Sequence, residues 1–288
     1  MPITLSTPDT AGLAEAVAVL REWQRDGAPF QLHPGDIGWF WRFGAAATAA
    51  AVRIWRRDRR ILAVGLLDGA DLLRVTIAMH AHQDEELARK LATDATTPGN
   101  GVLPPGRVAV EAPKGALVQG LLAEAGWRTD APWSPLRRDL TEPVEDPGLR
   151  IEVVGPELVS ARTSVHRSAF GLPGFTDERW GAMAAGVPYS AARCLLAYDG
   201  DGSAVAAVTV WSAGPGRPGV IEPMGVHHDH RGRGHGRAIT VAAAAALREL
   251  GASSALVYTP SSNTGAVATY QSGGFERLPE VWDYYRPS

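Results

Sequence analysis

Apolar and polar positions form two kinds of pattern along the second half of the chain, one typical of strands and one typical of helices. Residues 194–213 contain two apolar runs on either side of the turn-forming sequence DGDG, which predicts a β-hairpin. Residues 219–226 and 254–260 are short apolar runs typical of strands. Residues 236–250 predict an alanine-rich helix that stops at Gly251. The remaining elements expected here are a strand at residues 149–155, helices at residues 156–170 and 177–186, a helix from Asn263 and a final strand.

The chain also contains an internal repeat. Residues 109–133 and 256–282 each show a strand, a proline turn, an amphipathic helix, a glycine followed by an aromatic residue, and a final strand with tryptophan. Such self-similarity indicates two related units. The Pro- and acid-rich residues 141–148 have the composition of a linker. We therefore predict an α/β (α+β) protein with two halves, residues 1–140 and 149–288.

Composition narrows the class of protein. Apolar residues make up 45% of the 288 residues, as in folded globular domains. The formal net charge is -3, so no global positive field favours nucleic acid or an anionic membrane. The single cysteine excludes an intramolecular disulfide. The first residues show no signal-peptide pattern, and no uncharged stretch approaches the roughly 20 residues of a membrane helix. A cytoplasmic location is expected.

The stretch HDHRGRGHGRAI, residues 228–239, lies between a predicted strand and a predicted helix. Glycines allow a ligand to approach the backbone closely, and the helix start presents unpaired N–H groups and a positive dipole end. With Arg231, Arg233 and Arg237 added, these features predict an anion site suited to phosphate.

Three other uses of this stretch fit the sequence less well. Adjacent histidines in a glycine turn lack the fixed spacing of a metal site. A single basic patch without interleaved aromatic residues is a poor RNA site. A dinucleotide-binding fold would place G-x-G-x-x-G after the first strand of a parallel βαβ unit, whereas this turn comes late and follows a hairpin.

The order of motifs carries a family resemblance. Residues 231–236 fit R-x-x-G-x-G, with EPMGV before them and Asn263, Tyr270 and a Gly-Phe pair after them. Over most of residues 149–288 this series resembles the GNAT superfamily of acyl-CoA-dependent N-acetyltransferases. The resemblance implies two tandem GNAT-like domains, each with a mixed, mostly antiparallel central sheet flanked by helices.

The resemblance also implies acetyl-CoA as cosubstrate and no metal. The strand that carries Pro223 would splay from its neighbour, so that the extended pantetheine arm pairs with free backbone groups as an added strand would. The implied acetyl-CoA contacts are Met224, Gly225, Val226, Arg231, Gly232, Arg233, Gly234, His235, Gly236, Arg237, Asn263 and Tyr270.

The first half lacks these features. The repeat places Asp84, Glu85 and Glu86 where the second half has Arg231-Gly232-Arg233. Three carboxylates suit a helix start but repel a pyrophosphate. We therefore predict a degenerate, structural GNAT-like domain. Its aromatic residues 33–44, HPGDIGWFWRFG, are expected to pack in a core, with a wall of the acceptor pocket as the alternative.

Acyl transfer to an amine needs a neutral amine, a stabilised oxyanion and a proton for the leaving thiolate. An alkyl ammonium has a pKa of about 10.4, so a base helps at neutral pH. Glu222 is the predicted base, and burial beside Trp211 or Tyr258 would raise its pKa. Tyr270, which the resemblance places near the thioester sulfur, is the predicted acid. Backbone N–H groups of residues 224–226 are the expected oxyanion donors.

The acceptor, a primary amine of a small molecule or peptide, is not identified by these residues. Asp177 and Glu178 suit either a cationic amine or a solvated helix start. If Glu222 is not the base, the alternatives are His166, Asp177 or a water chain. Two other classes stay open: an acyl-CoA-binding sensor without catalysis, and a nucleic-acid-binding module built on the RGRG turn. The expected partners are acetyl-CoA and an amine, not nucleic acid or a membrane, in a monomer or homodimer.

Overall fold

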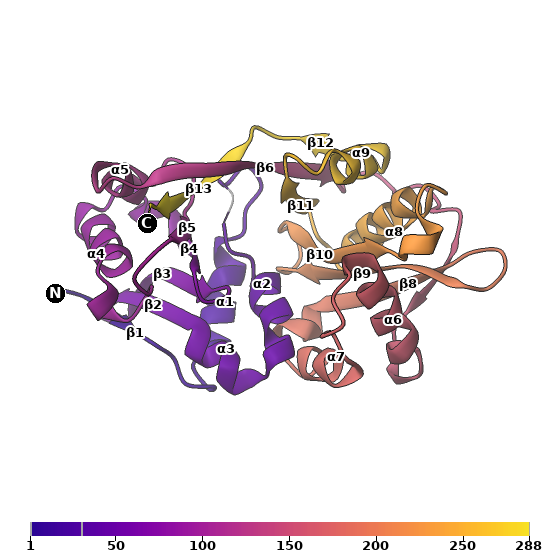
Figure 1. Cartoon of the computed structure of the whole chain (residues 1–288), viewed down its shortest axis with the longest axis horizontal. Coiled ribbons are helices and arrows are strands. Elements are labelled where there is room, and N and C mark those ends of the chain that lie inside the picture. Colours follow the sequence, from indigo (N-terminus) through magenta and orange to yellow (C-terminus); the bar gives the residue numbers. More distant parts are fainter. Residues whose placement is uncertain (1, 30, 288) are drawn as a thin grey trace.

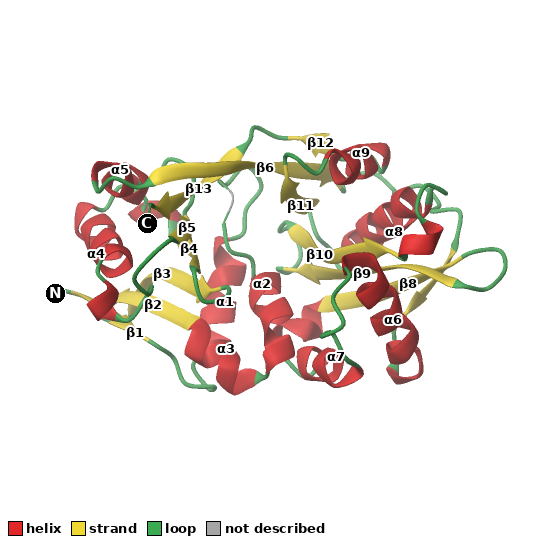
Figure 2. Cartoon of the chain, viewed as in Figure 1, coloured by secondary structure: helices red, strands yellow, loops and turns green. Residues whose placement is uncertain are grey.

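A single sheet of 13 strands runs through the whole molecule. The computed structural model describes residues 2–29 and 31–287. Strands follow one another in the order β1-β2-β3-β4-β5-β13-β6-β11-β10-β9-β8-β7, and β12 pairs with β6 beside this path. Figure 1 shows two lobes, the N-terminal one in indigo and purple and the C-terminal one in orange, with β6 reaching across both. Helices pack on the strands of each lobe (Figure 2).

The first half consists of six strands and five helices among the described residues. Its strands are β1 (Ile3–Ser6), β2 (Val52–Arg57), β3 (Arg60–Leu67), β4 (Leu72–Ile77), β5 (Val108–Glu111) and β6 (Arg128–Asp139). Its helices are α1 (Leu13–Trp23), α2 (Pro34–Phe40), α3 (Ala45–Ala51), α4 (Glu85–Thr96) and α5 (Leu117–Glu124).

The second half follows the predicted elements closely. Its strands are β7 (Arg150–Val153), β8 (Ala192–Tyr198), β9 (Ala204–Ser212), β10 (Gly219–Val226), β11 (Ser254–Pro260), β12 (Glu276–Arg277) and β13 (Val281–Arg286). Its helices are α6 (Val159–Phe170), α7 (Asp177–Ala184), α8 (His235–Glu249) and α9 (Thr264–Ser272). The predicted hairpin is β8–β9, and the predicted final strand is divided into β12 and β13.

The internal repeat corresponds to a repeated order of elements. In the first half β4, α4, β5, α5 and β6 follow one another, and in the second half β10, α8, β11 and α9 precede β12 and β13. Both units contain one parallel pair, β4 with β5 and β10 with β11, while the other pairs are antiparallel. The predicted mixed, mostly antiparallel sheets are confirmed, but they are joined into one.

The two halves are joined because they exchange strands. Strand β6 belongs to the first half by sequence, yet it pairs with β11 along residues 254–260. Strand β13 comes from the end of the chain and lies between β5 and β6. The boundaries predicted at residues 140 and 149 therefore do not separate two sheets. Residues 141–148 contain neither strand nor helix, and their role as a linker stays a prediction.

The aromatic segment of the first half forms the contact between the halves. A Cβ atom on Gly35 or Gly38 of α2 would lie 2.6 or 2.3 Å from atoms of Trp211 on β9, so only glycine allows this approach. His33, directly before α2, has its Nε2 3.2 Å from the carbonyl oxygen of Pro218. Helix α2 is thus pressed against the strands of the second half, which places Asp36 at the junction.

The acidic turn of the first half is used within the fold. The Asp84 side chain caps α4 by accepting a hydrogen bond from the Leu87 N–H at 3.0 Å. Arg57 forms ion pairs with Asp84 at 2.7 Å and with Glu86 at 2.8 Å. The helix start that would face a pyrophosphate therefore already carries an anion, as the sequence predicts. Separately, none of the helices in residues 2–29 and 31–287 has the length and apolar character needed to cross a membrane.

Candidate active site

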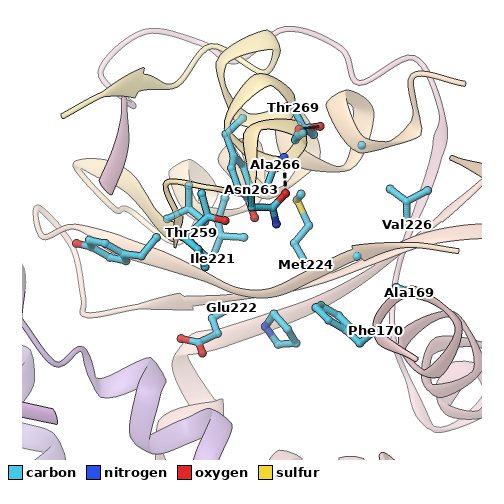
Figure 3. Close-up of a pocket in the computed structure, with 18 of the residues that line it drawn as sticks. Ala169, Phe170, Ile221, Glu222, Met224, Val226, Thr259, Asn263, Ala266 and Thr269 are labelled. Atoms are coloured by element: carbon cyan, nitrogen blue, oxygen red, sulfur yellow. Dashed lines mark hydrogen bonds between the residues drawn. The ribbon is translucent and has the colours of Figure 1, made fainter. Parts of the chain in front are cut away.

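Strands β10 and β11 part from each other near their middle. Their pairing is confined to Gly219 with Ala255 and Val220 with Leu256. On its other side, the pairing of β10 with β9 shifts between Ile221 and Met224, on either side of Pro223. Proline cannot donate to a ladder, so the interruption lies where the sequence predicts it. The gap widens into a cavity of about 930 Å³, part of which is drawn in Figure 3.

The glycine-arginine turn forms one end of this cavity. Gly232 and Gly234 have φ angles of +74° and +84°, which favour glycine, and Gly234 leads directly into α8. No side chain of the described residues caps the start of α8, so its first N–H groups point to a ligand position. The predicted acetyl-CoA contacts that line the cavity are Met224, Gly225, Val226, Arg231, Gly232, Gly234, Gly236, Arg237, Asn263 and Tyr270.

Arg233 and His235 do not line the cavity, contrary to the pattern carried over from the motif. Arg233 is exposed, and His235 is buried, with its ring 6.2 Å from that of His230. The other two arginines hold the turn in place. Arg231 donates to the carbonyl oxygen of Ala169 at 2.5 Å, and Arg237 donates to that of Ser272 at 3.0 Å.

Helix α9 supplies the two predicted side chains on the opposite wall. Asn263 caps the helix by accepting a hydrogen bond from the Ala266 N–H at 3.2 Å, the bond dashed in Figure 3. Tyr270 is 7% exposed and lines the cavity. Burial, and then the charge of Glu222, raise the pKa of the Tyr270 phenol above its ordinary value. It therefore keeps its proton at neutral pH and can donate it.

Glu222 lies on β10 where the two halves meet. Figure 3 shows its carboxylate on the opposite side of β10 from Asn263, directed toward the purple ribbon of the N-terminal half. Burial raises the pKa of Glu222 well above its usual range, and the nearby Asp36 carboxylate adds to this effect. Arg74 acts in the opposite direction. The backbone of Glu222 is held by a hydrogen bond, in which the Trp211 Nε1 donates to the Glu222 carbonyl oxygen at 2.6 Å.

A cluster of charged residues from the first half, not predicted from the sequence, also lines the cavity. Arg74 on β4 forms ion pairs with Asp36 at 2.8 Å and with Glu111 at 2.9 Å, and its Nη1 is 3.7 Å from Asp68. Asp68, Arg74, Glu111 and also Asp283 of β13 line the same cavity as Glu222. One signal was present in the sequence: Arg74 and Glu111 are the charged residues in otherwise apolar strands.

The alternative bases lie elsewhere. His166 is 6% exposed and packs against the rings of Trp39, Phe170 and Phe175. Burial, and then nearby arginines, lower its pKa to about 3, so it is neutral near pH 7. Asp177 accepts a hydrogen bond from Thr163 at the start of α7. Neither His166, Asp177 nor Glu178 is among the residues that line the cavity.

The histidines of the turn do come close to carboxylates. Asp199, His230 and His235 place one possible ligand atom each within 4.8 Å of one another, and His227, His228 and Asp229 do the same. The His230 Nδ1 is buried without a hydrogen-bond partner, 3.6 Å from an oxygen of Asp199. The spacing argument from sequence did not foresee these groups, and the absence of a metal stays a prediction.

Comparison with known proteins places the second half in a family. Residues 162–275 match the model of the acetyltransferase (GNAT) family. Over 93 residues the chain is 38% identical to mycothiol acetyltransferase of Geodermatophilus obscurus, which covers 31% of this chain and 30% of the relative. It is 44% identical over 59 residues to mycothiol acetyltransferase of Cellulomonas flavigena, covering 20% and 17%. The alignments thus span less than a third of these relatives.

Solved structures resemble the whole chain in fold. A GCN5-related N-acetyltransferase from Sphaerobacter thermophilus aligns with a TM-score of 0.60 at 20% identity, over 99% of this chain and 95% of that one. A tandem GNAT protein from the clavulanic acid biosynthesis pathway aligns with a TM-score of 0.63 at 13% identity, over 99% and 98%. These likenesses show that the whole chain has a tandem GNAT fold, and within it residues 162–275 match the acetyltransferase (GNAT) family.

Proposed function

We propose that this protein transfers an acetyl group from acetyl-CoA to a primary amine of a small molecule or peptide. One observation carries the proposal. The cavity between β10 and β11 joins an uncapped helix start, suited to a pyrophosphate, to a buried carboxylate suited to accept a proton. The family match of residues 162–275 and the named activity of the relatives support it.

The cosubstrate would lie along the open edge of β10. Backbone groups of residues 224–226, beyond the paired part of β10 and β11, would bind the pantetheine arm as an added strand does. The pyrophosphate would sit on the N–H groups at the start of α8. The thioester carbonyl would then lie near Glu222 and Tyr270, which line the same cavity.

In the proposed reaction Glu222 takes a proton from the amine, directly or through water, and the nitrogen attacks the thioester carbon. Backbone N–H groups of residues 224–226 stabilise the oxyanion. The intermediate collapses, the C–S bond breaks, and Tyr270 gives its proton to the departing thiolate. The products are the amide and CoA with a free thiol; Glu222 then releases its proton to solvent and Tyr270 regains one, which restores both groups.

The two halves have different parts in this proposal. Residues 149–288 carry the catalytic groups, and residues 1–140 are a structural GNAT-like domain that also lines the acceptor side of the cavity through Asp68, Arg74 and Glu111. Residues 141–148 link them. We further propose a cytoplasmic protein, monomeric or dimeric, that has no nucleic-acid partner, in keeping with its net charge of -3.

Two measurements test the function. Calorimetry with acetyl-CoA is expected to give one site per chain, because the first half has an anion at the equivalent helix start. A panel of primary amines is then assayed for release of CoA thiol. Acetyl-CoA binding without thiol release from any amine would favour a sensor, and a thermal shift with RNA but not with acetyl-CoA would favour the nucleic-acid alternative.

A further inference from the structure

The acceptor side of the cavity has more carboxyl groups than cationic groups. Besides Glu222, its lining includes Asp68, Glu111 and Asp283; Asp36 does not line the cavity but forms an ion pair with Arg74. Arg74 is the one cation that the described lining places among these carboxylates; Arg231 and Arg237 belong to the turn at the other end. Arg42 does not line the cavity. Burial lowers the pKa of Arg42, and the charges of Asp68 and Glu222 act in the opposite direction. The excess of carboxylates is therefore built into the cavity wall.

Arg74 does not donate a hydrogen bond to every carboxylate of this cluster. Its guanidinium bonds Oδ1 of Asp36 and Oε2 of Glu111, while Asp68 lies at 3.7 Å, beyond hydrogen-bond distance. The other oxygen of Glu111, Oε1, is buried and has no hydrogen-bond partner. Glu111 as a whole is 9% exposed. A buried carboxylate oxygen without a donor is costly, so a donor supplied by a ligand would restore a lost interaction.

The strand exchange places Asp283 beside Glu111. Strand β13 pairs with β5 from Tyr284 with Val110 onward, so Asp283 lies next to the end of β5. On its other side the pairing of β13 with β6 shifts between Trp282 and Tyr284, an irregularity of the kind that redirects a side chain. Burial has the largest effect on the Glu111 carboxyl group, whose pKa is raised to about 7. Arg74 acts in the opposite direction, and the negative charge of the neighbouring Asp283 raises the pKa of Glu111 further.

We propose that the acceptor is at least a diamine, whose second ammonium group binds to Glu111, Asp283 and Asp68 while the first amine meets Glu222. This inference rests on the proposed acetyl transfer and specifies its substrate class. An ammonium group offers three donors and no acceptor, so it matches a wall of carboxylate oxygens. An anionic acceptor would be repelled by the same wall, and a neutral one would leave the excess charge uncompensated.

The alternative is a purely structural network at the junction of the halves. Both accounts explain the Arg74 ion pairs, but they differ in what a ligand does. A structural network makes no distinction between a monoamine and a diamine. A cation subsite favours the diamine, and only while its carboxylates are charged.

The test compares n-butylamine with α,ω-diamines from 1,3-diaminopropane to 1,6-diaminohexane as acceptors for the wild-type chain. The variants are Glu111→Gln, which keeps an oxygen for Arg74, and Asp68→Asn, which leaves the Arg74 contacts with Asp36 and Glu111 in place. Glu124→Gln on the exposed end of α5 is the matched control.

We expect at least one diamine to exceed n-butylamine in kcat/KM by about 10-fold to 100-fold, the effect of a hydrogen bond between charged groups. The ratio should fall toward one in Glu111→Gln and in Asp68→Asn but not in Glu124→Gln.

Diamine binding, measured by calorimetry without turnover, distinguishes a failure of the subsite proposal from a failure of the proposed acetyl transfer. If no amine releases thiol, the acetyl-transfer proposal fails, and the subsite is still supported by diamine binding that Glu111→Gln weakens. Equal kcat/KM values for n-butylamine and every diamine, or equal binding to wild type and Glu111→Gln, would overturn the subsite while leaving acetyl transfer intact. If Glu111→Gln does not fold, Asp68→Asn decides between the two outcomes.

Discussion

Glu222 is surrounded by charged groups from α2, β4 and the loop after β3, and its role can be tested through them. Burial has the largest effect and raises its pKa, Asp36 and Asp68 raise it further, and Arg74 lowers it. The variant Glu222→Gln keeps the shape of the side chain but cannot take a proton. We expect turnover at neutral pH to fall by about 10²-fold or more, with acetyl-CoA affinity nearly unchanged. The measurements are thiol release and calorimetry on the same preparation.

The pH dependence of this variant distinguishes base from acid. Part of the lost Glu222→Gln turnover should return as pH rises, because more of the amine is already neutral. Tyr270→Phe removes a proton donor instead, so its reduced turnover should show no such alkaline recovery. A Glu222→Gln profile that matches wild type would make Glu222 a bystander, and the base would have to be a water chain or another carboxylate of the cavity.

Asp36 gives a second prediction at the residue scale. Its carboxylate raises the pKa of Glu222, so Asp36→Asn should lower that pKa while Arg74 and Arg42 still favour the charged form. In the proposed reaction activity depends on deprotonated Glu222, hence the rising limb of the kcat/KM profile should move to lower pH. A limb that stays in place, or moves to higher pH, would show that Asp36 does not act on Glu222. Both profiles should be recorded with the same acceptor.

Gly234 tests the anion turn. The substitution Gly234→Asp adds bulk and a negative charge at the start of α8, where φ is +84°. We expect acetyl-CoA binding to be lost in a folded protein. Gly202→Asp is the control, because this glycine has a φ of +80° in the β8–β9 turn and does not line the cavity. Equal acetyl-CoA affinity in the two variants would reject the position of the pyrophosphate.

At the scale of elements, α2 determines how closely the halves approach. Gly38→Ala places a Cβ 2.3 Å from the Trp211 ring, a clash that should cost more than the roughly 1 kcal/mol gained from helix propensity. Gly120→Ala is the matched change on the exposed face of α5, where nothing lies within 4 Å. We expect the first variant to lower the thermal midpoint and the second to raise it. Two shifts of the same sign would contradict the tight contact of α2 with β9.

At the scale of the whole molecule, the exchanged strands make the halves dependent on each other. A fragment of residues 149–288 lacks β6, so the β11 edge is unpaired and β13 has lost both neighbours. Unpaired edges promote association, and we expect this fragment to be less soluble and less stable than the full chain. A fragment that starts at residue 128 keeps β6 and should be better behaved, as judged by size-exclusion chromatography and thermal unfolding. A soluble, active fragment of residues 149–288 would show that the first half is dispensable.

The sequence by itself determined the elements of the second half and the anion turn. Periodicity, turn residues and helix ends are local properties, so the helix that follows Gly234, the cap at Asn263 and the interruption at Pro223 were all predictable. The acidic turn at Asp84 was equally evident. Each of these features depends on residues only a few positions apart.

Only the tertiary structure decided how the halves share one sheet and which charges meet in the cavity. Strand exchange depends on pairing between β6 and β11 and between β13 and β5, and alternation along a strand does not specify its partner. Asp36, Arg74, Glu111 and Asp283 come from four different elements and become neighbours only after that pairing. Long-range packing set the acceptor side of the site because the charges there interact through space and not along the chain.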